Sequence, residues 1–524
     1  MAEPRAGSPG ATSGVVGPVA GVPAVIQVTA DALGPGVRRV LDEGGRFVML
    51  TGLDERGLGG DGLAVEAVAV RADRSLARFR VALPVDGAAY PSITPLVPAA
   101  HWDERELRDL LGIVPVGHPD SRRLVLHERW PRGYHPLRKD VPAGERPPLA
   151  DRRFVPFEVH GEGVYQLPVG PIHAGVIEPG HFRFSAIGER VLHLDARLFF
   201  THRGLEKLVE GRTFGRALPL VERACGVCTV THALAYAQAV EELTGVAVPD
   251  RARWTRVLLA ELERLYNHVG DLGNICAGIG FTSGVARLGW LKERLLRVND
   301  GLTGHRYLMG VVAPGGLLAD LDPGALAALP ALLDETGHEL AAAVRALVRS
   351  DGVMARLHAT GIVPTGTAAA LGALGVAARA SGIHADLRVD RPYAAYAGLG
   401  VEVVTASAGD AAARFHVRAQ EAHESLRLLR EVLARLPEGP VAADPRDAVV
   451  PAPGATALGA AEGPRGASWI WLRAGADGTV DRLRLRSASF ANWPVVAAAV
   501  PGNLVPDFPL INKSFELCYA CTDR

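Results

Sequence analysis

Residues 222–232 read ERACGVCTVTH, and residues 518–524 read CYACTDR. Each stretch contains a Cys-x-x-Cys pair, Cys225/Cys228 and Cys518/Cys521, and together the pairs offer four soft sulfur ligands to a thiophilic transition metal. Zinc ribbons place their two pairs about 15 to 20 residues apart, whereas about 290 positions separate the pairs here. The spacing therefore predicts a metal held in the core of a large domain. A redox dithiol remains an alternative for either pair alone, and a zinc-stabilised scaffold is an alternative for both.

Composition limits the class of partner. The 524 residues include 56 Lys and Arg against 57 Asp and Glu, for a formal net charge of −1, which gives no electrostatic reason to expect nucleic acid. Five cysteines in so long a chain argue against a secreted disulfide framework. Residues 1–23 are rich in Gly, Pro, Ala and Ser and are expected to form a disordered leader. No run of 18 or more uncharged apolar residues is present, so contact with a membrane is expected to come through other subunits.

The pattern along the chain predicts an α+β protein: a small mixed α/β N-terminal domain followed by a large, mainly helical domain. Residues 24–140 alternate strands, expected at 47–50, 63–70 and 78–84, with a charged helix at 102–111. A polar, Pro-rich joint at 141–154 separates this unit from residues 155–524.

In the second domain, apolar residues recur at helical spacing from 254 to 272, at 325–348 and at 416–436. The Ala/Gly/Pro tract at 438–463 is predicted to be a long surface loop, and 468–500 to contain a strand hairpin.

The motif around Cys225 resembles the R-x-C-G-x-C-x-x-x-H motif of [NiFe]-hydrogenase large subunits, and the C-terminal motif resembles their second one. Further stretches are similar to the branch related to respiratory complex I: residues 170–181 (GPIHAGVIEPGH), 201–208 (THRGLEKL), 304–307 (GHRY) and 379–382 (RASG). The N-terminal domain resembles another complex I peripheral-arm subunit, at 102–106 (WDERE), 117–120 (GHPD) and 136–140 (PLRKD). The same fusion occurs in the large subunits of formate hydrogenlyase and hydrogenase-4 complexes, which are energy-converting hydrogenases.

This resemblance implies a Ni-Fe(CO)(CN)2 centre. All four cysteines would bind nickel, and Cys228 and Cys521 would also bridge to the iron. The chemistry of H2 cleavage is consistent with such a centre. Heterolytic cleavage needs a polarising metal and a base, and a metal-bound thiolate can serve as the base.

Other residues take roles by the same resemblance. Glu178 matches a proton relay, against the alternative of a surface Glu. His232 would hydrogen-bond a bridging sulfur rather than fill the core. Arg465 and Asp271 match groups above the open metal face, against a solvated loop cation and a helix-surface Asp. Glu206 matches a ligand of a nearby Mg or Fe ion, against an exposed helical Glu.

The chain departs from the family at two places. Glu516-Leu517 stands where Asp-Pro usually precedes the second pair, which puts the level of activity in doubt. Arg524 stands where many relatives supply a His to the Mg or Fe ion, which puts that ion in doubt. Either a C-terminal extension was removed after nickel insertion, or the protein matures without that step.

The function implied is reversible H2 formation and cleavage at the cytoplasmic side of the cell membrane. Too few cysteines remain for an iron–sulfur cluster, so electrons would pass to a small subunit with a [4Fe-4S] cluster, and the assembly would continue to ferredoxin-like and membrane antiporter-like subunits. The alternative is a metal-free, quinone-facing electron-transfer module of a complex I-like oxidoreductase.

Overall fold

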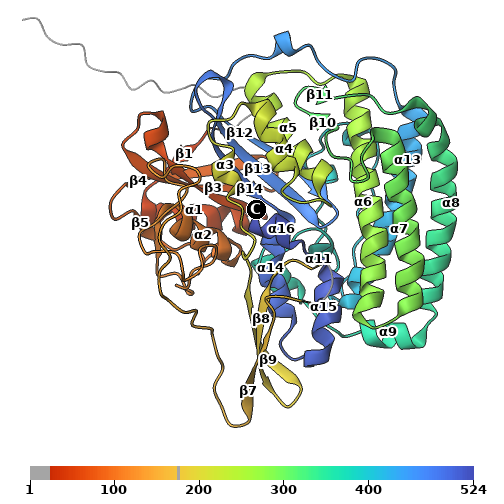
Figure 1. The fold of residues 1–524 in the computed structure, drawn as a ribbon, viewed down its shortest axis with the longest axis horizontal. Helices are drawn as coiled ribbons and strands as arrows, with labels where there is room; N and C mark the ends of the chain where they lie inside the picture. Colours follow the sequence, from red (N-terminus) through yellow and green to blue (C-terminus); the bar gives the residue numbers. More distant parts are fainter. Residues whose placement is uncertain (1–23, 174–176) are drawn as a thin grey trace, which may run out of the picture.

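The computed structural model describes residues 24–173 and 177–524. The N-terminal part lies on one side of the molecule and a bundle of long helices on the other, with the C-terminus between them (Figure 1). The leader expected at 1–23 lies outside the described residues.

The N-terminal part is built on a four-stranded sheet in the order β1-β4-β3-β2, from β1 (Ile26–Gln27), β2 (Arg46–Asp54), β3 (Gly62–Val70) and β4 (Leu76–Pro84). The three strands predicted here are confirmed, and each is buried over most of its length because apolar residues occupy both faces. Helices α1 (Ala30–Asp42) and α2 (His101–Leu111) accompany the sheet, and α2 confirms the charged helix. A short parallel pair, β5 (Ala89–Pro91) and β6 (Val114–Val116), completes this part.

A long irregular segment connects the two parts. Residues 117–163 form neither helix nor strand, and the predicted 141–154 linker lies inside this segment. Its first half is anchored because Leu124, Val125, Leu126 and Leu137 are buried in the core.

Four long helices form the bundle: α6 (Asp250–Gly278), α7 (Thr282–Thr303), α8 (Pro323–Val348) and α13 (Ala411–Arg435). Three of them confirm the helical periodicity at 254–272, 325–348 and 416–436. In the part of the chain that the structure describes, no helix is both long and apolar enough to cross a membrane. The shorter helices are α3 (Leu205–Leu208), α4 (Phe214–Glu222), α5 (Thr229–Thr244), α9 (Asp351–Leu357), α10 (Thr365–Ala370), α11 (Gly375–Arg379), α12 (Leu387–Asp390), α14 (Ala488–Ala499), α15 (Phe508–Phe515) and α16 (Tyr519–Asp523).

Two further sheets flank the centre of the molecule. Strands β7 (Val164–Val169), β8 (His181–Ile187) and β9 (Arg190–Arg197) form an antiparallel sheet that projects from the body (Figure 1). Strands β12 (Thr456–Gly463), β13 (Gly466–Ala474) and β14 (Val480–Arg486) form the other, while β10 (Val312–Ala313) and β11 (Gly316–Leu317) make a short hairpin.

The surface loop predicted at 438–463 is therefore wrong over its last eight residues, which form β12. The small residues of this tract permit close packing on α5, because a Cβ at Gly459 would lie 1.9 Å from the carbonyl oxygen of Ala235. The hairpin predicted within 468–500 is present as β13 and β14, followed by α14.

The two parts share apolar clusters at their junction. Trp102 on α2 packs against Phe199 and against Phe490 on α14, with ring centroids 5.7 and 5.6 Å apart. Met49 and Leu53 of β2 join Trp469 of β13 in a second cluster. The N-terminal part is thus built into the molecule rather than appended to it.

Candidate metal centre

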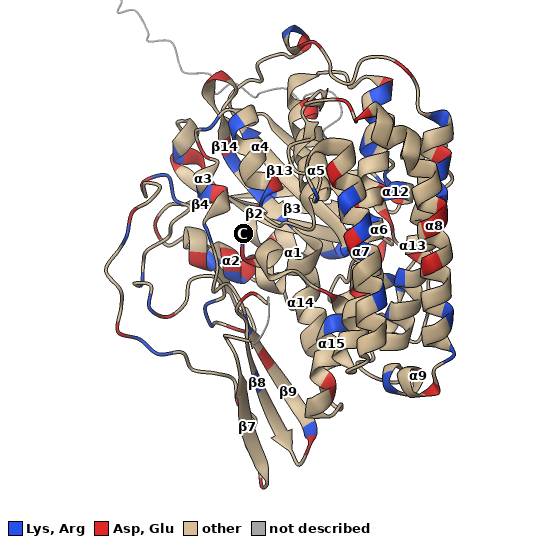
Figure 2. Cartoon of the chain, turned by 45° about the vertical axis from the view of Figure 1, so that its right-hand side comes forward, with Lys and Arg blue, Asp and Glu red and all other residues tan. Residues whose placement is uncertain are grey.

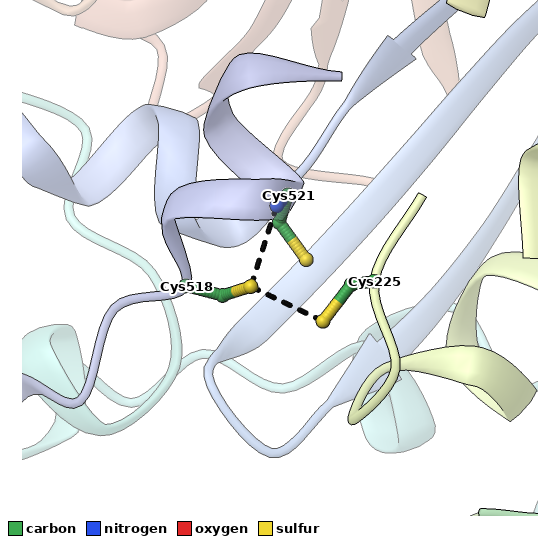
Figure 3. A group of neighbouring side chains, drawn as sticks. All are labelled: Cys225, Cys518 and Cys521. Atoms are coloured by element: carbon green, nitrogen blue, oxygen red, sulfur yellow. Dashed lines mark hydrogen bonds between the residues drawn. The ribbon is translucent and has the colours of Figure 1, made fainter. Parts of the chain in front are cut away.

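The fold brings the two Cys-x-x-Cys pairs together. The first pair lies between α4 and α5, and the second leads into α16. The Sγ atoms of Cys225 and Cys518 are 3.1 Å apart, and the sulfurs of Cys225, Cys518 and Cys521 all lie within 4.8 Å of one another (Figure 3). Cys228 belongs to the same cluster and lines a small cavity with Cys521 and Arg465.

Backbone N–H groups point at two of the sulfurs. The N–H of Val227 donates to Cys225 Sγ and that of Cys521 to Cys518 Sγ, both at 3.3 Å. Cys228 is the N-cap residue of the 16-residue helix α5, where the helix dipole stabilises negative charge.

The sulfur cluster cannot ionise fully on its own. Hydrogen bonds from Cys225 and Cys521 lower the pKa of Cys228 to about 6. The hydrogen bond with Cys225 raises the pKa of Cys518 to about 12, and burial raises that of Cys521. Four clustered sulfurs, three from buried cysteines and one from the half-buried Cys518, fit a soft cation, which would allow all four to bind as thiolates.

Arg203 joins the two pairs. The sequence motif at 201–208 contains this residue but does not predict its role. Its Nη2 donates to the carbonyl oxygens of Ala224 at 2.8 Å and Ala520 at 2.9 Å, each next to a cysteine. Its backbone N–H donates to the carbonyl of Arg524 at 2.7 Å.

His232 faces the second cysteine pair. The side chain is fully buried on α5, and its Nε2 is 3.8 Å from Cys521 Sγ. Burial lowers its pKa to about 4, so the imidazole is neutral. Its Nδ1 has no hydrogen-bond partner among the described residues.

Arg465 lies beside the sulfurs and pairs with Asp271, and neither is a surface residue. The Arg465 guanidinium, in the turn between β12 and β13, donates to Asn267 Oδ1 at 2.8 Å, to Asp271 Oδ1 at 3.2 Å and to the Glu516 carbonyl. Asp271 also accepts from Arg418 at 2.8 Å. Both alternatives, a solvated loop cation and a helix-surface Asp, are wrong because both side chains are buried.

Glu516, at the departure from Asp-Pro, adopts a left-handed backbone conformation with φ of 52°. Its Oε2 accepts from Asn274 at 3.3 Å. Burial, followed by the nearby Asp271 charge, raises its pKa to about 7. Leu517, at the position of the family's proline, packs into the apolar core. This packing fixes the backbone that leads to Cys518.

Glu178 contacts the second pair directly. Its Oε2 accepts a hydrogen bond of 2.6 Å from the backbone N–H of Ala520, between Cys518 and Cys521. Partial burial, followed by the charge of Cys518, raises its pKa. The residue is exposed to solvent in this chain, so the carboxyl can exchange protons with its surroundings.

Glu206 does not fit the expected Mg or Fe ion. It is buried, and its carboxylate accepts from Arg482 at 3.0 Å, Arg484 at 3.3 Å and Arg524 at 2.9 Å. Three guanidinium groups already neutralise this carboxylate and would repel a divalent cation. The interpretation as an exposed helical Glu is equally wrong.

Family models match three stretches of the chain. Residues 26–147 match the respiratory-chain NADH dehydrogenase 30 Kd subunit, 203–272 the nickel-dependent hydrogenases, and 279–524 the respiratory-chain NADH dehydrogenase 49 Kd subunit. The hydrogenase match contains the first cysteine pair and ends just after Asp271.

Two curated relatives extend over almost the whole chain. Formate hydrogenlyase subunit 5 of Escherichia coli is 36% identical over 92% of this chain and 85% of its own length, and hydrogenase-4 component G of the same organism is 36% identical over 92% and 84%. Among solved structures, an archaeal membrane-bound sulfane sulfur reductase, described as a respiratory membrane complex, matches with a TM-score of 0.65 and 27% identity over 69% of this chain and 99% of that chain.

These matches confirm the resemblance drawn from the motifs, including the fused N-terminal domain. The chain belongs to the family of fused large subunits of complex I-related, energy-converting hydrogenases, as a subunit of a hydrogenase-related oxidoreductase complex.

Proposed function

We propose that this chain is the catalytic subunit of a [NiFe] hydrogenase that forms and cleaves H2 reversibly. The observation that carries the proposal is the convergence of four sulfurs from two distant Cys-x-x-Cys pairs, with the Glu178 carboxyl hydrogen-bonded to the backbone between the last two. A redox dithiol needs only one pair, and a structural zinc site needs neither this carboxyl nor the arginine beside the sulfurs.

In this proposal the four cysteines hold a nickel–iron centre, which when bound supplies the metal that polarises H2 and exchanges electrons with it. Cys228 and Cys521, the second residue of each pair, would hold both metals. Glu178 moves protons between the sulfur of Cys518 and solvent, a task that suits a carboxyl with a raised pKa. His232 orients the sulfur of Cys521.

Arg465 and Asp271 close a further side of the sulfur cluster. Asp271 holds the Arg465 guanidinium in place, so that its positive end stays next to Cys228. This charge orients polar groups and limits water there.

The remaining proposals concern the assembly. Electrons pass to a small subunit carrying a [4Fe-4S] cluster and on to ferredoxin-like subunits, and membrane antiporter-like subunits attach the chain to the cytoplasmic side of the cell membrane. The family membership and the likeness to a respiratory membrane complex support this arrangement.

Isotope exchange tests the catalytic role without the electron partners. The purified complex, incubated with D2 in H2O, is expected to release HD. Cys225→Ser should abolish the exchange, whereas Cys276→Ser, a buried cysteine outside the cluster, should retain it. A nickel-containing wild-type complex that forms no HD would refute the proposal.

A second candidate is a metal-free, quinone-facing electron-transfer module. The match of residues 279–524 to an NADH dehydrogenase subunit and the Glu516-Leu517 departure favour it. In that case HD formation would be absent in wild type, and Cys225→Ser would leave quinone-linked electron transfer unchanged.

A further inference from the structure

A buried charge cluster lies behind the second cysteine pair. Two carboxylates, Glu106 on α2 and Glu206 on α3, meet three guanidinium groups, Arg482 and Arg484 on β14 and Arg524 after α16. All five side chains are at most 5% exposed. Figure 2 shows the acidic residues of α2 in red close to the C-terminus. The cluster thus joins the N-terminal part, the β12–β14 sheet and the C-terminal segment that contains Cys518 and Cys521.

The Arg524 side chain binds residues of both parts of the molecule. Its Nη2 donates to Glu106 Oε2 at 2.5 Å, and its Nη1 donates to Glu206 Oε1 at 2.9 Å and to the carbonyl of Leu485 at 2.7 Å. Its guanidinium lies 4.9 Å from the centroid of the Phe490 ring. A planar, permanently charged group with several fixed donors is required to make these contacts together.

The cluster leaves no place for a divalent cation. The Glu206 oxygens accept four hydrogen bonds, three from the guanidinium groups and one of 3.1 Å from the backbone N–H of Leu485. Among the side chains, two carboxylates against three guanidinium groups leave one positive charge in excess, so an added cation would meet repulsion. Asp103, which also accepts from Arg484, is shared with Arg486 and does not reverse this balance.

Arg524 is connected to the metal ligands through a single turn. Its backbone N–H donates to the Ala520 carbonyl at 3.0 Å, and its carbonyl accepts from the backbone N–H of Arg203. Because Arg203 also binds the carbonyls of Ala224 and Ala520, the position of Arg524 sets that of the turn containing Cys521.

We infer that the Arg524 guanidinium replaces a divalent cation as the charge that orders the second cysteine pair, and that Glu106 of the N-terminal part positions this pair through it. Glu106 and Arg524 are thus positioning residues. The inference relies on the proposed function only for the identity of the bound metal, because the ordering of residues 518–524 exists without it.

The test is hydrogen exchange, measured by mass spectrometry, on the intact complex. Glu106→Gln removes one charge at nearly constant volume and leaves Arg524 with one carboxylate, so exchange in residues 518–524 should accelerate about 10-fold or more. Glu66→Gln is the matched control, since Glu66 is also buried and paired with an arginine, Arg78, and contacts Trp471 across the boundary between the two parts. It should leave residues 518–524 unchanged.

Equal exchange of residues 518–524 in the two variants would overturn the role of Glu106. A second measurement needs no variant: EDTA treatment of the wild-type complex should leave exchange in 518–524 unchanged. Faster exchange with EDTA, reversed by added Mg²⁺, would show that a cation orders this segment and would also overturn the inference. Backbone exchange reports these results whether or not the complex turns over H2, so they separate this inference from the proposed function.

Discussion

At the scale of single residues, the candidate centre depends on contacts with sulfur or with the backbone beside it. Glu178 and Arg203 form hydrogen bonds with the backbone of Ala520. His232 faces the sulfur of Cys521, and Arg465 donates to the carbonyl oxygen of Glu516. The role expected of each can be separated by substitutions that keep its size.

Glu178→Gln should reduce H2 turnover by about 100-fold or more, because the amide retains an acceptor for the Ala520 N–H but cannot carry a proton. Nickel content should stay at the wild-type level. Turnover assays with nickel analysis of the same samples check this.

The matched control is Glu189→Gln in the exposed turn between β8 and β9, which should leave turnover unchanged. An unimpaired Glu178→Gln complex would assign proton transfer to another group.

Arg203→Lys should lower the nickel content per chain several-fold, because a lysine cannot bind the Ala224 and Ala520 carbonyls with the same fixed geometry. Arg216→Lys on the exposed side of α4 provides the comparison. Metal analysis of both variants measures the nickel content per chain. Equal nickel contents would contradict the role given to Arg203.

At the scale of elements, segments that are distant in sequence hold the ligands in place. Helix α5 begins at the first pair, and its N-terminus is satisfied by Glu263 of α6, which accepts from the N–H groups of Val230 and Thr231 at 2.7 and 3.0 Å. Residues 122–127 dock on the segment after β9 through His127, whose Nε2 donates to the Leu198 carbonyl at 2.8 Å.

Acid should loosen this docking. Burial, followed by the Arg197 charge, lowers the pKa of His127 from 6.5 to about 4. Between these values the unfolded state binds the additional proton, so local stability should rise from pH 4 to 6.5 and then level off, by at most about 3 kcal/mol.

Hydrogen exchange of residues 198–200, corrected for the intrinsic rates, measures this dependence. His127→Gln keeps a donor for Leu198 and should flatten the profile. The same slope in that variant would assign the effect to other groups.

Local patterns predicted much of the architecture. Strands β2 to β4, helix α2 and the long helices follow from apolar periodicity, and the cysteine motifs with Glu178, His232, Arg465 and Asp271 predicted the members of the site. Strand β12 was missed because its Ala and Gly residues carry no strand pattern and gain stability from packing on α5. The arginines paired with Glu206 were missed because long-range ion pairs leave no local signal.

At the scale of the whole molecule, the N-terminal part and the helical part are held by a common core and by the charge cluster behind Arg524. Trp102 lies at the junction, between Phe199 and Phe490. The two parts are therefore expected to lose stability together.

Trp102→Ala should destabilise both parts by about 3 to 5 kcal/mol, because it leaves a cavity at the shared core. Amide exchange should accelerate in α2 and in α14 alike. Trp290→Ala, at a side chain 53% exposed, should have little effect. Faster exchange confined to α2 would contradict a common core.

The central claim is that the four sulfurs hold a nickel–iron centre. Metal analysis of the complex purified from its native host without oxygen, combined with an infrared spectrum of the same sample, tests this most directly. We predict about one nickel per chain, together with stretching bands of CO and cyanide. An intact complex with zinc alone or with no metal, and with no such bands, would contradict the account.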